Sequence, residues 1–164
     1  MKKSLFVPLC LVLILVASLE SCKKDDKYTI ENQPVTGTMN YTTTGMVPIE
    51  FDQQGNPVTF QISLEGSGTL TNLGEINMTS TFKFSVLTFN GYDFVTTYTG
   101  ANPEDSFSSE GSSKLDQTLT GDLVEVVTNG NGKFENIIGG GITVISIFPD
   151  QSGGTGDVSW NITY

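Results

Sequence analysis

Strict alternation of apolar and polar side chains is the feature that most constrains how this chain can fold. It runs through residues 58–65, 76–86 and 158–164, with Ser80 in register at one apolar position of the second segment. In the first of these segments, polar residues separate the apolar side chains of Val58, Phe60, Ile62 and Leu64. A period of two is typical of a strand that buries one face, and no segment of similar length has the spacing of an amphipathic helix. The pattern therefore predicts an all-β fold.

Turn sequences separate these segments at the intervals that antiparallel hairpins require. They are Gln54-Gly55-Asn56-Pro57, Asn72-Leu73-Gly74, Asn90-Gly91, Asn129-Gly130-Asn131-Gly132 and Ser152-Gly153-Gly154. Asn-Gly pairs readily adopt the positive φ angles of tight turns. We therefore expect strands near residues 35–45, 47–52, 58–71, 75–89, 93–100, 115–128, 141–149 and 157–164. Eight antiparallel strands can close on themselves and leave no edge, so we predict a single small antiparallel β-barrel, with a β-sandwich as the alternative.

The chain begins with the composition of a secretory signal peptide. Lys2 and Lys3 give it a positive start, and an apolar run follows over residues 5–19. A helix that spans a bilayer needs roughly 20 apolar residues, so the shorter run indicates a cleaved leader over residues 1–21.

The end of this leader resembles the site at which bacterial lipoproteins are cut and lipidated. Leu19 and Ser21 stand at the third and first positions before Cys22. We expect cleavage after Ser21 and acylation of Cys22, whose two or three chains give a stable membrane anchor. Glu20 departs from the usual motif, and a plain secretory signal is the alternative.

Residues 24–26, Lys24-Asp25-Asp26, resemble the short tag that directs some bacterial lipoproteins to the outer face of the outer membrane. The predicted location is therefore the outer membrane, with the protein lipid-anchored and facing the cell surface. The periplasmic face is the alternative location, and a plain charged tether is the alternative reading of the tag.

Removal of residues 1–21 leaves 143 residues, which suit one domain. The polar, unpatterned segment 22–34 reads as a tether, and the barrel domain takes up residues 35–164. Lysines then number 8 − 2 = 6 and acids 18 − 1 = 17, for a net charge of −11. With no Arg and no basic stripe, nucleic acid is not an expected partner, and Cys22 is the only cysteine left, which excludes a disulfide framework.

Residues that carry catalysis are scarce. The chain has no His, and lipidation leaves no free Cys, so the usual nucleophile–base pairs and histidine metal sites cannot form. We predict no catalytic residue, no metal site and no cofactor. The acidic segment that holds Asn102, Glu104 and Asp105 is the candidate ligand-binding loop, and a solvated acidic turn is the alternative reading.

Five short motifs resemble, in order, the signature of bacterial secreted proteins related to the allene oxide cyclase and dirigent barrels. They are Leu64-Glu65-Gly66-Ser67-Gly68, Thr71-Asn72-Leu73-Gly74, Ala101-Asn102-Pro103-Glu104-Asp105, Gly130-Asn131-Gly132-Lys133-Phe134 and an end strand over residues 156–164. The resemblance covers roughly residues 60–164, and it implies an eight-stranded barrel, a trimer and an apolar cavity.

Three polar positions of that signature differ in this chain. Asn72 stands for a histidine, Pro103-Glu104 is inserted, and Lys133 stands for an arginine. The plant enzymes of this fold cyclise an unsaturated fatty-acid epoxide, and the dirigent proteins steer the coupling of phenolic radicals. A shared fold does not by itself carry an activity over to this chain.

The predicted core faces carry bulky aromatic side chains, namely Phe60, Phe82, Phe84 and Trp160. Side chains can just fill the interior of an eight-stranded barrel. We therefore expect a filled interior, with a hollow lumen as the alternative.

Two segments, residues 123–127 and 141–148, are apolar on both faces. The outer face of a small soluble barrel is normally polar, so these segments predict a covered exterior in a homo-oligomer or with a partner. Scattered surface apolar residues are the alternative.

Together these features predict a non-enzymatic envelope lipoprotein whose barrel binds a small apolar ligand or another envelope component. The alternative is a small cofactor-free isomerase or cyclase that acts on an apolar ligand in the barrel cavity. A hollow lumen that contains a carboxylate would favour the second function.

Overall fold

The computed structural model describes residues 31–164, so the predicted signal peptide, Cys22 and the export tag lie outside the described residues. The strands are β1 (Gln33–Phe51), β2 (Pro57–Leu70), β3 (Gly74–Ser85), β4 (Asn90–Gly100), β5 (Ser106–Leu115), β6 (Thr120–Asn131), β7 (Ile138–Ile147) and β8 (Gly153–Thr163). A single 3-10 turn, η1 (Gly132–Phe134), is the one helical element of this part. No helix within residues 31–164 has the length and apolar character needed to cross a membrane.

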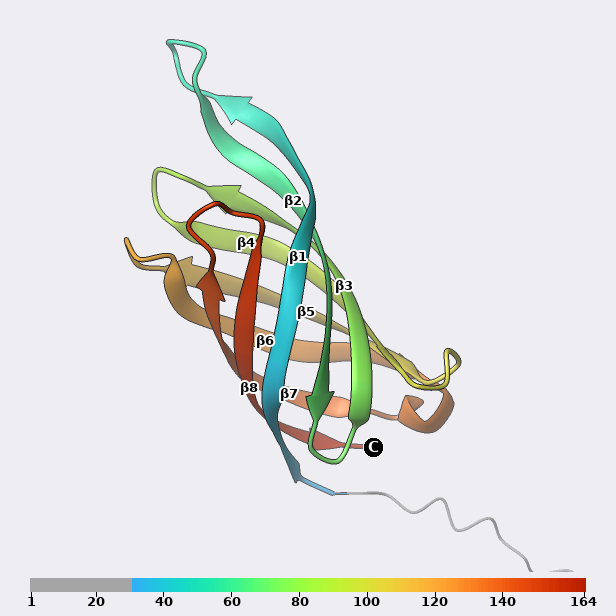
Figure 1. Ribbon diagram of the computed structural model, residues 1–164. Helices are drawn as coiled ribbons and strands as arrows, with labels where there is room; N and C mark the ends of the chain where they lie inside the picture. The colour runs from blue at the N-terminus through green and yellow to red at the C-terminus, as the bar shows by residue number, and fades with distance from the viewer. Residues whose placement is uncertain (1–30) are drawn as a thin grey trace, which may run out of the picture.

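The eight strands form one closed antiparallel barrel in chain order (Figure 1). Each strand pairs with the next, and β8 pairs back onto β1, with Trp160 opposite Val35. Closure satisfies the backbone hydrogen bonds at both edges of the sheet. The predicted all-β barrel is confirmed, and the sandwich alternative is excluded.

Two strand predictions were wrong although the count of eight was right. The segments 35–45 and 47–52 are parts of one 19-residue strand, β1, whose register against β2 shifts between Thr43 and Gly45 and again near Glu50. These irregularities bend the strand without ending it. The opposite error concerns β5, which was not predicted because its sequence, SFSSEGSSKL, is rich in serine and has little apolar alternation.

Two predicted turns also differ. The β3–β4 turn occupies residues 86–89, where Phe89 has a φ of 57°, and Asn90 and Gly91 already belong to β4. Similarly, β6 continues through Asn131, and η1 then leads into β7. The remaining three turn sequences lie at or directly beside the observed turns.

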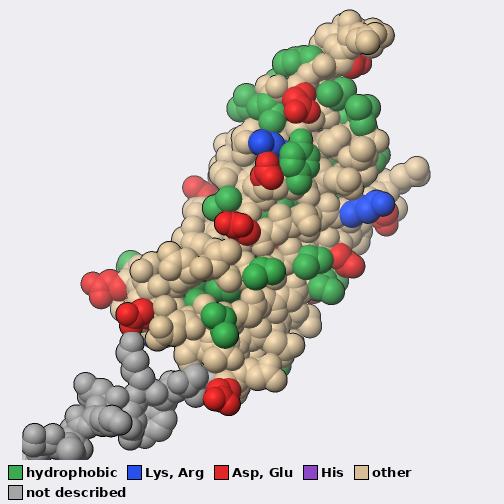
Figure 2. All heavy atoms as spheres, turned by 180° about the vertical axis from the view of Figure 1, so that it is seen from behind, with side chains coloured by type: hydrophobic (Ala, Val, Ile, Leu, Met, Phe, Trp, Pro, Cys, Tyr) green, Lys and Arg blue, Asp and Glu red, His purple; other side chains and the backbone are tan. Residues whose placement is uncertain are grey.

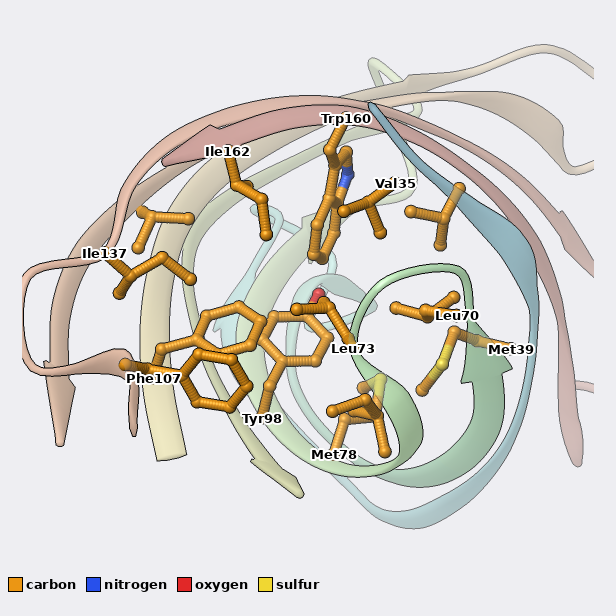
Figure 3. Packing of buried hydrophobic residues seen from close by; sticks show 14 residues of the cluster. Val35, Met39, Leu70, Leu73, Met78, Tyr98, Phe107, Ile137, Trp160 and Ile162 are labelled. Carbon is orange, nitrogen blue, oxygen red and sulfur yellow. The ribbon is translucent and has the colours of Figure 1, made fainter. Parts of the chain in front are cut away.

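One end of the barrel, here called the closed end, is densely packed with apolar side chains (Figure 3). Tyr98 stacks on Phe107 with ring centroids 4.9 Å apart, and Phe107 meets Phe134 edge to face at 5.3 Å. Trp160 packs against Tyr98 at 5.2 Å. Phe134 belongs to η1 and is buried, so this short turn helps to close this end of the barrel.

The opposite end, here called the mouth, is formed by the turns that join β1 to β2, β3 to β4, β5 to β6 and β7 to β8. The β1–β2 hairpin extends well beyond the other turns (Figure 1). A smaller buried cluster lies below the mouth, with Phe82 and Phe94 stacked at 4.2 Å. The two ends therefore differ: apolar side chains close one of them, and long hairpins surround the other.

Candidate functional site: a cavity with a buried carboxyl group

A cavity of about 230 Å³ lies inside the barrel, between the closed end and the mouth. Its lining is mostly apolar, and it includes Phe60, Phe82 and Phe84. Exposed residues of the mouth, among them Met46 and Val86, also line the cavity, so it reaches the surface there. The expected filled interior is therefore correct only for the closed end, where Trp160 is buried.

Glu125 of β6 is the one carboxyl group in the lining of this cavity, and its side chain is only 2% exposed. Its Oε1 atom accepts hydrogen bonds from the hydroxyl of Tyr98 at 2.8 Å and from that of Ser109 at 2.7 Å. Thr143 donates to Oε2 at 3.2 Å. In turn, Thr143 accepts a hydrogen bond from Nε1 of Trp160 at 3.2 Å. Four strands thus hold the carboxyl group in a fixed orientation.

Small residues on both neighbouring strands make room for this glutamate. Gly111 of β5 and Gly141 of β7 lie directly opposite Glu125 in the sheet. A Cβ atom on Gly111 would collide with the Val124 carbonyl oxygen and lie 3.2 Å from Cγ of Glu125. The alternation of β6 turns Glu125 inward together with Leu123 and Val127, both of which are buried.

Burial shifts the pKa values of the titratable groups in this site. It raises the pKa of Glu125 above the ordinary value of 4.5, and the hydrogen bonds from Ser109, Tyr98 and Thr143 only partly oppose that effect. Burial and the nearby glutamate raise the pKa of Tyr98 well above 10.0. Burial also raises the pKa of Tyr41, which lines the same cavity and donates its hydroxyl proton to the Thr155 carbonyl oxygen. A carboxyl group with a raised pKa can donate a hydrogen bond or exchange a proton with a bound molecule.

A second polar pair lies on the same side of the cavity. The hydroxyl groups of Ser80 and Thr96 are 2.9 Å apart, and both side chains are buried in the lining. The polar atoms of Ser80, Thr96 and Glu125 therefore come from the continuous stretch of strands from β3 to β6. The cavity has an apolar body with a few polar groups, as small-molecule sites commonly do.

The loop predicted to bind a ligand lies elsewhere. Asn102, Glu104 and Asp105 form the β4–β5 turn, and none of them lines the cavity. The side chain of Asn102 accepts the backbone N–H of Glu104 at 3.3 Å, and Oδ1 of Asp105 accepts that of Lys133 at 2.9 Å. These contacts hold η1 beside the turn. A ligand-binding role for this loop stays a prediction.

No group of three or more His, Cys, Asp or Glu side chains within residues 31–164 is placed to hold a metal ion. The sequence reasoning missed Glu125 and its partners Tyr98, Ser109 and Thr143. The sequence carries only part of the signal, because Glu125 shares the two-residue period of Leu123 and Val127 but Val124 and Val126 make the opposite face equally apolar.

Comparison with protein-family models, with curated proteins and with solved structures gave no match, so the cavity and its carboxyl group are the basis for a functional assignment.

Proposed function

We propose that this protein is a lipid-anchored envelope protein whose barrel binds a small apolar ligand. The observation that carries the ligand-binding proposal is the cavity, which is lined mainly by aliphatic and aromatic side chains and reaches the surface at the mouth. Burial of an apolar molecule there removes its surface and that of the lining from water, at roughly 25 cal/mol per Å². The small number of polar groups suits a molecule that is apolar over most of its surface.

Native mass spectrometry tests this proposal. Residues 23–164, which contain the whole barrel, would be exposed to a lipid and metabolite extract of the producing cell. We expect a reproducible additional mass. Leu64→Trp, which extends a lining side chain into the cavity, should abolish that mass, whereas Glu65→Trp on the exposed face of the same strand should retain it. A bare protein mass in all three samples would contradict the proposal.

The second candidate function is a cofactor-free isomerase or cyclase, and Glu125 is the observation that favours it. A carboxyl group in a water-poor cavity can move a proton within a bound molecule. Isomerisation conserves mass, so the test is chromatographic: ligand incubated with the protein should change its retention time, and Glu125→Gln should leave it unchanged. An unchanged retention time with the native protein would contradict catalysis, and an equal change with both proteins would contradict the role of Glu125.

The anchor and the location are part of the same proposal. The Leu19-Glu20-Ser21-Cys22 sequence and the following Lys24-Asp25-Asp26 support lipidation at Cys22 and display on the outer face of the outer membrane. Cys22→Ser in the full chain should release the protein from the membrane fraction. Replacement of Lys24, Asp25 and Asp26 by alanine should leave it membrane-bound but protected from protease added to intact cells.

A further inference from the structure

The charge pattern of the cavity allows its ligand to be specified further, and this step rests on the proposed ligand-binding function. Residues 31–164 contain only three basic side chains, Lys83, Lys114 and Lys133, and none of them lines the cavity. Among the lining residues, only the carboxyl group of Glu125 can carry a charge near neutral pH. An anionic ligand would therefore leave water without gaining a countercharge, which is costly in an apolar site.

The mouth also disfavours anions. Three of its four turns contain an aspartate, namely Asp52, Asp116 and Asp150, whose Oδ1 atoms accept backbone N–H groups at 2.8–3.1 Å. These hydrogen bonds keep the pKa of each aspartate below its usual value, so the mouth carries fixed negative charge. Lys83, the basic residue of β3, is paired with Asp93 at 2.9 Å. The negative potential of these aspartates opposes the entry of an anionic ligand.

One oxygen atom of the Glu125 carboxyl group can still accept a ligand contact. Oε1 already accepts two hydrogen bonds, whereas Oε2 has a single partner, Thr143, at 3.2 Å. A carboxyl oxygen can take part in a further hydrogen bond. Burial raises the pKa of Glu125 above its ordinary value, and so favours, relative to an exposed glutamate, the protonated form that can donate to a carbonyl or hydroxyl oxygen.

We infer that the cavity selects an uncharged rather than an anionic apolar molecule, with one hydroxyl or carbonyl oxygen that hydrogen-bonds to Glu125. Anionic molecules of the fatty-acid type and of equal length are discriminated against. Apolar contact then supplies affinity, and the single carboxyl group supplies the choice between neutral and anionic head groups.

A matched ten-carbon pair tests the inference: 1-decanol and decanoate, each titrated into residues 23–164 at about pH 7. Calorimetry measures affinity. Trp160, the single tryptophan of the sequence, reports by fluorescence on the network next to Glu125, since its Nε1 binds Thr143. We expect 1-decanol to bind, and decanoate to bind more weakly by at least about tenfold, because its buried charge has no countercharge in the cavity.

Two variants distinguish recognition of the ligand by Glu125 from a general effect of the protein's negative charge. Glu125→Gln keeps the shape and a donor but cannot ionise, so 1-decanol binding should survive while the penalty against decanoate shrinks. Glu110→Gln removes the same charge from the exposed face of β5 and should leave the order of affinities unchanged. Decanoate binding as tightly as 1-decanol would overturn the inference and leave the proposed function standing. Binding of neither molecule would overturn both.

Discussion

At the scale of a single residue, Glu125 makes the stability of the barrel depend on pH. Its pKa lies above 4.5 in the folded protein. As pH rises above 4.5, Glu125 loses its carboxyl proton in the unfolded chain but keeps it in the folded chain. The free energy of unfolding therefore falls. The fall ends once pH passes the folded pKa, and it amounts to about 1.4 kcal/mol per pH unit between the two pKa values.

Urea unfolding of the native chain and of Glu125→Gln, measured between about pH 4 and 8, checks this expectation. The native midpoint should drop as pH rises, and the variant should vary less. Asp52, Asp116 and Asp150 have lowered pKa values and lose their stabilising effect only as pH falls through and below 3.8, so they do not mask the difference. Parallel pH profiles for the two proteins would show that Glu125 does not set this dependence.

The sequence predicts part of this site. Alternation assigns Glu125 to the face of Leu123 and Val127, but Val124 and Val126 make the other face equally apolar. The two-residue period therefore does not show which face of β6 points into the barrel. In the structure Leu123, Glu125 and Val127 lie inside, and Gly111 and Gly141 stand directly opposite Glu125 on the neighbouring strands.

At the scale of an element, β5 depends on its small residues. Gly111→Ala would place a Cβ atom against the Val124 carbonyl oxygen and the side chains of Glu125 and Leu123. Overpacking of this kind typically costs about 1–3 kcal/mol. Gly45→Ala in β1 is the matched control, because its Cβ atom would meet nothing closer than the Ser63 Cβ atom at 3.7 Å.

Chemical denaturation of both alanine variants measures the difference. We expect Gly111→Ala to lower the free energy of unfolding clearly and Gly45→Ala to change it by no more than about 0.5 kcal/mol. Equal effects at the two positions would mean that β5 shifts to accept the extra carbon atom.

The same small residues explain why β5 was not predicted as a strand from the sequence. Its inward positions are Phe107, Ser109, Gly111, Ser113 and Leu115, and only the first and last of these are apolar. Ser109 is inside because it donates to Glu125. The inward positions of β5 are thus determined by contacts with residues of other strands, and the local sequence pattern of β5 does not contain that information.

At the scale of the whole molecule, the alternation and the turns were enough to predict closure into an eight-stranded barrel. The division into a packed end and a hollow end could not be predicted, because it depends on which side chains from different strands meet in the interior. Figure 2 shows acidic side chains spread over the face of the molecule that it presents, whereas the aspartates of the mouth come together because closure brings three turns to one end.

The outer wall of β6 and β7 carries the predicted interface between copies of the chain. Val124 and Ile142 lie directly opposite each other, and Val126 and Val144 extend the same exposed apolar wall. Contiguous apolar surface of this kind is typical of interaction sites. We expect residues 23–164 to form a homo-oligomer, with a trimer implied by the resemblance to the allene oxide cyclase barrels.

Light scattering at tens of micromolar measures this assembly. Val126→Lys places a charge in the wall and should shift the protein towards the monomer mass, because an ammonium group buried between two copies lacks a partner. Val47→Lys is the matched control, since Val47 and Val126 are both 59% exposed but Val47 lies on β1, near the mouth. A monomeric native chain would disprove the oligomer, and an oligomer broken only by Val47→Lys would place the interface at the mouth, where it would cover the entrance to the cavity.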